Sequence, residues 1–210
     1  MTGSGVLTFT GSAEDDSAIT ITGGNGADIL TGGSTLTAGD TINGGNGDDT
    51  IDGDAGIDTL NGDDGDDIFK VSVVGDFIGL TVAETVNGGA GTDTLTVVGA
   101  VTIADADLAR VTTTETITLA DATNSVTLST NAVAAGIVNI NGGTGADTIN
   151  GSSVAETIIS GTGADVIKAG GGADNITVAG TDDQIHQVAI TDSGIGGYTA
   201  GMTATSVSTV

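Results

Sequence analysis

The chain has 210 residues, with 28 acidic and only 3 basic side chains, and its formal net charge is −25 at neutral pH. This charge excludes a nucleic-acid-binding protein, which needs Lys and Arg side chains to neutralise phosphates, and it argues against docking on an anionic membrane. An excess of carboxylates instead suits hard divalent cations, which take oxygen ligands.

The side chains available for a core are small. Aromatic residues make up 2% of the chain, whereas 37 residues are Gly and none is Cys. Such a chain cannot build a thick core, but it can build a thin core that repeats along an axis; a disordered chain is the alternative that composition leaves open. Without Cys there is no disulfide framework and no thiolate metal site, and no stretch is long and apolar enough to span a membrane.

The first predicted element is an N-terminal β segment, residues 1–22. Within it, VLTFT (6–10) and AITIT (18–22) alternate apolar and hydroxyl side chains, as short β-strands do. The segment begins without a basic stretch followed by an apolar run, so we expect no Sec-type signal peptide in it.

A nine-residue repeat follows, and we assign residues 23–96 to a first repeat block. Residues 44–70 divide into three consecutive units, GGNGDDTID, GDAGIDTLN and GDDGDDIFK. Further copies occur at residues 23–31, 32–43 (with three extra residues) and 88–96. Every unit has an acidic residue at position 6 and an apolar residue at position 8. We expect residues 71–87 to form an extended excursion that returns to the repeat at Glu84.

Residues 97–141 depart from the nine-residue frame. The stretches LTVVGAVTIAD, TETITLAD and NSVTLST alternate apolar and hydroxyl side chains, which predicts β-strands. The stretch ADADLAR permits a short helix at Asp105–Arg110. We therefore expect a β segment that lacks the loop motif of the repeat, and an irregular linker is the alternative.

The repeat resumes in a second block, residues 142–186. Four contiguous units fill residues 142–177, and a degenerate unit ends at His186. The unit at 151–159 has lost most of its glycines, so a metal site is less expected there. The tail, residues 187–210, is nearly uncharged and rich in hydroxyl side chains.

Each unit combines a tight turn with a short strand. The Gly-rich first half can turn tightly because glycine adopts positive φ, and the last three residues alternate and form a brief strand. The side chain at position 8 then points inward, while those at positions 7 and 9 point outward. Two units complete one coil, so we predict an all-β fold: a flattened parallel β-roll, or β-helix solenoid, built from nonapeptide repeats.

The units resemble the pattern G-G-x-G-x-D-x-U-x of RTX (repeats-in-toxin) proteins, also called haemolysin-type calcium-binding repeats, and S-layer or surface-protein members among them. The resemblance implies that Ca²⁺ lies between successive turns on one edge of the roll, held by position-6 carboxylates and loop carbonyls. The metal ligands that it assigns are Asp28, Asp40, Asp49, Asp58, Asp67, Asp93, Asp147, Glu156, Asp165, Asp174 and Asp183. The alternative is that these are ordinary solvated turn residues.

Every second unit returns to the same edge in this geometry, which predicts specific neighbours among the carboxylates. Asp28 is expected to join Asp49 if the insertion at 35–37 bulges out without changing the register. The other predicted neighbours are Asp49 with Asp67, Asp40 with Asp58, Glu156 with Asp174, and Asp147 with Asp165 and Asp183.

The sequence offers no catalytic arrangement, and we predict that the chain is not an enzyme. His186 is the only histidine, so a zinc site with several imidazoles is impossible, and no G-x-S-x-G motif accompanies it. Paired carboxylates, which a glycosidase would need, are periodic here, and metal binding explains the period.

The predicted function is that of a secreted, calcium-binding structural protein that folds with Ca²⁺ and self-assembles at the cell surface as an S-layer, filament or extracellular matrix subunit. Its expected partners are further copies of itself, with cell-envelope polysaccharide as a further candidate, and neither nucleic acid nor membrane insertion is expected. The resemblance implies an extracellular location reached by type I secretion, with residues 187–210 as the candidate signal.

Two other classes of function stay open. The first is a calcium-dependent folding and secretion module of a larger secreted enzyme or toxin. The second is a ligand-binding roll, such as an adhesin or an ice-binding module, because Thr144 and Thr162 occupy equivalent positions in two GTGAD loops.

Overall fold

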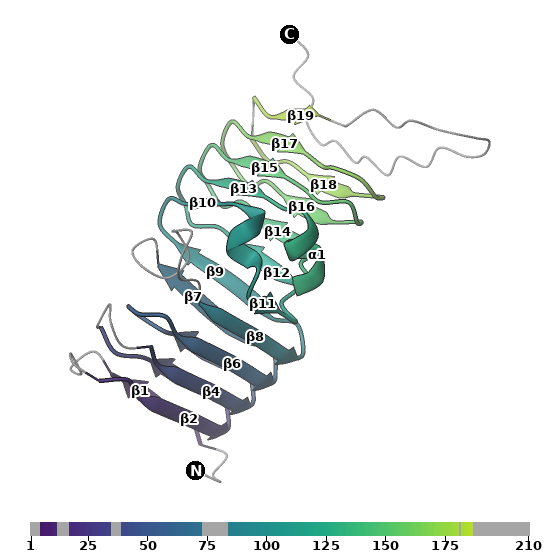
Figure 1. Ribbon diagram of the computed structural model, residues 1–210. Helices are drawn as coiled ribbons and strands as arrows, with labels where there is room; N and C mark the ends of the chain where they lie inside the picture. The colour runs from purple at the N-terminus through teal and green to yellow at the C-terminus, as the bar shows by residue number, and fades with distance from the viewer. Residues whose placement is uncertain (1–4, 12–16, 35–38, 73–83, 181, 187–210) are drawn as a thin grey trace.

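The computed structural model describes residues 5–11, 17–34, 39–72, 84–180 and 182–186. It confirms the predicted fold class, because the paired strands are parallel and stack turn upon turn into an elongated β-solenoid (Figure 1). Among these residues no helix is long and apolar enough to cross a membrane. The tail at 187–210 and most of the excursion at 71–87 lie outside the described residues.

One sheet runs along the whole described solenoid and is called the long sheet below. Its strands pair in the order β1-β3-β5-β7-β9-β12-β14-β16-β18. Their bounds are β1 (Thr8–Thr10), β3 (Ile29–Thr31), β5 (Thr50–Asp52), β7 (Ile68–Ser72), β9 (Thr94–Val98), β12 (Thr116–Thr118), β14 (Asn139–Asn141), β16 (Thr157–Ile159) and β18 (Asn175–Thr177).

Two shorter sheets alternate with the long sheet along the chain. The N-terminal sheet contains β2 (Thr20–Asn25), β4 (Thr41–Asn46), β6 (Thr59–Asp64), β8 (Thr85–Ala90) and β11 (Val111–Thr112). The C-terminal sheet contains β10 (Thr102–Ile103), β13 (Ser125–Thr127), β15 (Thr148–Asn150), β17 (Val166–Lys168) and β19 (Gln184–His186). The N-terminal strands expected at 6–10 and 18–22 are therefore present as β1 and β2.

The core is mainly a stack of apolar side chains contributed by the strands from β2 to β18, with Val71 and Val97 as second buried residues on β7 and β9. The position-8 residues of the long sheet lie in register, as Leu30 does with Ile51 and Ile51 with Phe69, and all three are fully buried. Their neighbours at positions 7 and 9 are partly or fully exposed. The alternation predicted from the repeat therefore sets which side chains enter the core.

Residues 97–141 continue the solenoid and contain the place where one short sheet replaces the other. After β9 the chain forms β10 in the C-terminal sheet, then the 3₁₀ helix η1 (Asp105–Leu108), and then β11, the last strand of the N-terminal sheet. One turn thus contributes to all three sheets. The short helix expected at 105–110 is present as η1.

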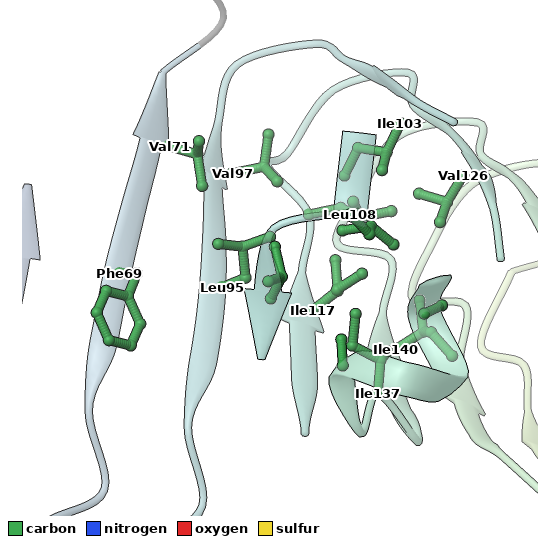
Figure 2. Close-up of a cluster of buried hydrophobic side chains, with 14 of the residues drawn as sticks. Phe69, Val71, Leu95, Val97, Ile103, Leu108, Ile117, Val126, Ile137 and Ile140 are labelled. Atoms are coloured by element: carbon green, nitrogen blue, oxygen red, sulfur yellow. The ribbon is translucent and has the colours of Figure 1, made fainter. Parts of the chain in front are cut away.

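A second helix, α1 (Thr130–Ala135), packs against η1 and β11 (Figure 1). The sequence analysis did not predict it, although Ser129 at its N-cap and Gly136 at its C-cap are residue types that favour helix ends. The Ser129 side chain makes no capping hydrogen bond. The Asp105 carboxylate, which is distant in sequence, accepts hydrogen bonds from the backbone N–H groups of Ser129, Asn131 and Ala132 instead. With these helices the core broadens around Leu108, Ile117 and Ile137 (Figure 2).

Candidate metal centres

The position-6 residues stand directly before the strands, so the strand register stacks them into three rows. The long-sheet row is Leu7, Asp28, Asp49, Asp67, Asp93, Glu115, Val138, Glu156 and Asp174. The N-terminal-sheet row is Ile19, Asp40, Asp58, Glu84 and Ala109. The C-terminal-sheet row is Val101, Asn124, Asp147, Asp165 and Asp183. All eleven residues predicted as ligands lie in these rows.

One carboxylate oxygen of most acidic residues in a row supports the turn before it; the exception is Glu156, whose Oε1 atom bonds to Ser152 in its own unit. The Oδ1 atom of Asp49 accepts a hydrogen bond from the Asp28 N–H at 2.7 Å, and that of Asp67 accepts one from the Asp49 N–H at 2.8 Å. The same bond joins Asp40 to Asp58, Asp58 to Glu84, Asp67 to Asp93, Asp147 to Asp165, Glu156 to Asp174 and Asp165 to Asp183. The structure therefore brings together the neighbours that the two-unit coil predicts, including Asp28 with Asp49 and the return at Glu84.

The second carboxylate oxygen is buried in most of these residues and has no hydrogen-bond donor. This holds for Oδ2 of Asp28, Asp49, Asp67, Asp93, Asp147, Asp165 and Asp183 and for Oε2 of Glu156. A buried acceptor without a partner costs free energy, and a buried charge without a partner costs more. Such oxygens are the groups that a bound cation would satisfy.

In the units that begin with glycine, this oxygen lies in a narrow space beneath that first glycine. Among the residues just named, these are the units of Asp28, Asp49, Asp67, Asp93, Asp147 and Glu156. A Cβ atom on Gly44 would overlap Asp49 Oδ2 and would lie 2.7 Å from the carbonyl oxygen of Gly62 in the next turn. A Cβ atom on Gly62 would likewise overlap Asp67 Oδ2 and the Gly88 carbonyl oxygen. The glycine is needed here because the backbone and the carboxylate approach so closely. The carboxylate and the carbonyl oxygen face the same space, which is an all-oxygen donor set of the kind that hard cations prefer.

In the described part of the chain no three acidic or histidine side chains converge on one point. A cation in these loops would therefore draw part of its coordination from main-chain carbonyls. Calcium accepts this, because it takes carboxylate and carbonyl oxygens together in flexible geometry. The residues present thus fit Ca²⁺, whereas a zinc site, which needs nitrogen or sulfur ligands, does not match them.

Burial shifts the pKa of several carboxyls upward. Loss of solvent raises the pKa of Asp67 to about 7; the Asp49 backbone N–H opposes this shift, while the charges of Asp93 and Asp49 add to it. Burial is also the largest cause of a raised pKa at Asp49, Asp93, Asp147 and Glu156. The ionised rows therefore oppose folding, and a cation beside them would reverse that effect.

The predicted residues are not all alike. Both oxygens of Asp40 are hydrogen bonded, Oδ1 to the Ile19 N–H at 2.9 Å and Oδ2 to the Gly33 N–H at 2.6 Å, so the protein itself satisfies this carboxylate. Glu156 is partly satisfied, because its Oε1 atom accepts hydrogen bonds from the Ser152 N–H and hydroxyl. Ser152 replaces the second glycine of that unit, which explains why this unit departs from the pattern.

Two other units keep the loop shape without the second glycine. Asp54 and Asp63 occupy that position and adopt φ values of 61° and 75°. Asp is among the few residues with a side chain that tolerate this left-handed region. The two substitutions therefore add carboxylates to the loops and do not change the path of the backbone.

Sequence reasoning missed two polar members of the rows, Glu115 and Asn124. Glu115 Oε2 accepts a hydrogen bond from the Asp93 N–H at 2.8 Å. Asn124 Oδ1 accepts one from the Val101 N–H at 3.1 Å, and its amide donates to Asp147 Oδ1 at 3.0 Å. Both stand directly before a Thr- or Ser-led apolar triplet, TIT or SVT. A search for such triplets that did not also require the glycines of the repeat would have identified both residues.

Comparison with known families agrees with this geometry. The sequence model of the RTX calcium-binding nonapeptide repeat matches the chain at residues 8–34, 36–69, 78–96, 139–153 and 150–185. These segments make up more than half of the chain. A search of curated proteins found no match.

Proposed function

Because the chain belongs to the RTX calcium-binding nonapeptide repeat family, we propose that it binds Ca²⁺ along its three rows and has a structural role outside the cell. The observation that carries this proposal is the series of buried carboxylate oxygens without a donor, most of them beside a loop carbonyl. The repeats of this family form a structural, calcium-binding roll and not a catalytic fold. They are also typical of secreted proteins.

The residues that would hold the cations are the predicted set in the three rows. The proposal is strongest for Asp28, Asp49, Asp67, Asp147 and Asp165, which are almost completely buried and each have one oxygen without a donor. It is weakest for Asp40, whose two oxygens both have donors. Bound Ca²⁺ would supply the positive charge that makes stacked, desolvated carboxylates favourable.

Calcium binding and folding are expected to be coupled. A ligand that binds only the folded state stabilises it, by about 2.7 kcal/mol for each site when its concentration is a hundredfold above its Kd. Titration of the chelator-treated chain with CaCl₂, followed by far-UV circular dichroism, tests the proposal. We expect a cooperative gain of β signal that MgCl₂ does not reproduce, since Mg²⁺ demands near-ideal octahedral geometry and gives up its water reluctantly. A full β spectrum in excess chelator, unchanged by calcium, would contradict the proposal.

We further propose that the folded solenoid assembles with other copies of itself into a surface layer, filament or matrix. Within the described residues, β1 and β18 end the long sheet, and each pairs on one side only. Strands of this kind can pair with another chain, and head-to-tail contacts that do not close give filaments. Sedimentation velocity and electron microscopy with and without calcium test this step. Monomers alone at saturating calcium would contradict assembly and would leave calcium binding intact.

A further inference from the structure

Asp93 lies where the matched repeat ends and the unmatched segment begins. Its side chain is fully buried. Its Oδ1 atom accepts a hydrogen bond from the Asp67 N–H at 2.8 Å, and its Oδ2 atom has no donor. Asp93 therefore has the same unsatisfied oxygen as Asp49 and Asp67, although the loop that faces it in the next turn, residues 112–115, is not a nonapeptide loop.

The facing loop nevertheless places a carbonyl oxygen where the repeat would place one. A Cβ atom on Gly88 would overlap both Asp93 Oδ2 and the Thr113 carbonyl oxygen. The same relation joins Gly62, Asp67 Oδ2 and the Gly88 carbonyl in the turn before. The Thr113 carbonyl thus occupies the position that the carbonyl of a glycine occupies beside the repeat loops, as Gly88 does beside Asp67.

Thr113 is held in this position by a strained backbone and by hydrogen bonds. Its φ is 46°, a value that a β-branched residue rarely adopts. Its hydroxyl accepts a hydrogen bond from the Gly89 N–H at 2.8 Å and lies 2.9 Å from Asn87 Oδ1, to which it donates. Strain that the surroundings maintain is often found at functional positions.

A second carboxylate completes the arrangement. Glu115 Oε2 accepts the hydrogen bond from the Asp93 N–H at 2.8 Å, as the position-6 Asp of a repeat would do. The next residue of the row is Val138, which offers no carboxylate, so the series from Asp28 to Glu115 is interrupted there. The chemistry of the repeat loops therefore extends one turn beyond the repeat and ends at Glu115.

We propose a divalent cation site between loops 88–93 and 112–115, with the Asp93 carboxylate, the Thr113 carbonyl and the Glu115 carboxylate as its protein ligands. This inference rests on the proposed function, since it assigns one more calcium site to the same row. It goes beyond the repeat, because Thr113 and Glu115 belong to no matched segment. A cation here joins the first repeat block to the middle of the solenoid.

The test counts bound calcium ions by native mass spectrometry on chelator-treated protein after addition of calcium acetate. Glu115→Gln keeps an oxygen that can accept the Asp93 N–H but removes the charge, and we expect it to bind one ion fewer than the unaltered chain. Asp182→Asn is the matched control, because Asp182 is exposed and lies outside the rows; its count should not change.

An equal count for Glu115→Gln and the unaltered chain would overturn this site while calcium binding by the repeats stands. An unaltered chain that binds no calcium would overturn the proposed function and this site together. If Glu115→Gln does not fold, hydrogen exchange of the unaltered chain decides instead. The amides of residues 112–116 should then gain at least about tenfold protection with calcium, and unchanged exchange at those amides would refute the site.

Discussion

The fully buried carboxylate of Asp67 accepts a hydrogen bond from the backbone N–H of Asp49, which lies one complete coil earlier in the chain. The bond uses only one of the two carboxylate oxygens; the other has no donor. The same side chain therefore holds neighbouring turns in register and carries a desolvated charge that opposes folding. This double role links the stability of the solenoid to both protons and cations.

The metal-free protein should become more stable as the pH falls from about 8 to about 5. Burial raises the pKa of Asp67 to about 7 from an ordinary value of 3.8, so the folded state holds this proton more tightly than the unfolded state does. Stability is then greatest below the ordinary pKa and is lost as the pH rises through about 7. One pKa unit corresponds to about 1.4 kcal/mol, which is ~2–4 °C in Tm at this chain length. Thermal unfolding of metal-stripped protein should show a shift of several degrees.

Asp67→Asn is the control for this pH dependence, because it keeps an acceptor for the Asp49 N–H and cannot ionise. It should reduce the difference in Tm between pH 5 and pH 8. A metal-free protein with higher Tm at pH 8 than at pH 5 would show that the rows are not desolvated as the structure has them.

Gly62→Ala should weaken calcium-dependent folding. The added Cβ overlaps Asp67 Oδ2 and the Gly88 carbonyl oxygen, so the two oxygens that face the proposed site must move apart. The φ of Gly62 is not left-handed, so the effect comes from the overlap and not from backbone strain. We expect the calcium concentration at half-folding to rise at least about tenfold, which corresponds to ~1.4 kcal/mol.

Gly171→Ala is the matched control in the second block. A Cβ atom there meets nothing closer than 3.5 Å, and its φ is not left-handed either. Its effect should stay within about 0.5 kcal/mol, as for most surface substitutions. Equal calcium midpoints for the two variants would show that the close packing of Gly62 against Asp67 Oδ2 and the Gly88 carbonyl does not matter for calcium-dependent folding.

Asp105→Ala should destabilise the protein to the same extent at every calcium concentration. The substitution removes the acceptor for three backbone N–H groups at the start of α1. Loss of a helix cap costs about 0.5–2 kcal/mol. Asp105→Asn, which keeps one oxygen acceptor, should cost less. The check is urea unfolding at two calcium concentrations, and a cost that changes with calcium would place Asp105 in the metal-dependent part of the fold.

The sequence predicted the parts of this structure that depend on a fixed nine-residue phase. In every unit the apolar residue follows the acidic residue by two positions, as Ile51 follows Asp49. Assigning the nine-residue phase therefore placed both the core residues and the carboxylate rows. The register did not change at the insertion at 35–37, since the Asp28 N–H still donates to Asp49 Oδ1 in the next turn.

The unpredicted parts depend on contacts between residues that are far apart in sequence. The cap that Asp105 provides for α1 reaches across more than twenty residues. The TIT triplet after Glu115 signals a strand, but only the pairing of β12 with β9 places Glu115 in the row. The replacement of the N-terminal sheet by the C-terminal sheet occurs within one turn and leaves no local signal in composition.

Removal of calcium should unfold the repeat blocks before the middle of the solenoid. In the turns around 97–141 the rows contain Val101, Ala109, Asn124 and Val138, and Glu115 is their one carboxylate, so few desolvated charges oppose folding there. The Asn124 amide donates to the carbonyls of Ala120 and Ala122, which no carboxylate could do.

The core supports the same order of unfolding. Around β12 and β14 it gains side chains from η1 and α1, including Leu108 and Ala132, in addition to the single stack of the repeats (Figure 2). More apolar area per turn is buried there, and its stabilising effect does not depend on metal. Hydrogen exchange in metal-stripped protein at neutral pH should therefore find amides of β12, β13 and β14 protected at least about tenfold more than those of β4, β5 and β6. Saturating calcium should reduce this difference, because it stabilises the repeats selectively. Uniform exchange along the metal-free chain would mean that calcium controls the solenoid as a single cooperative unit.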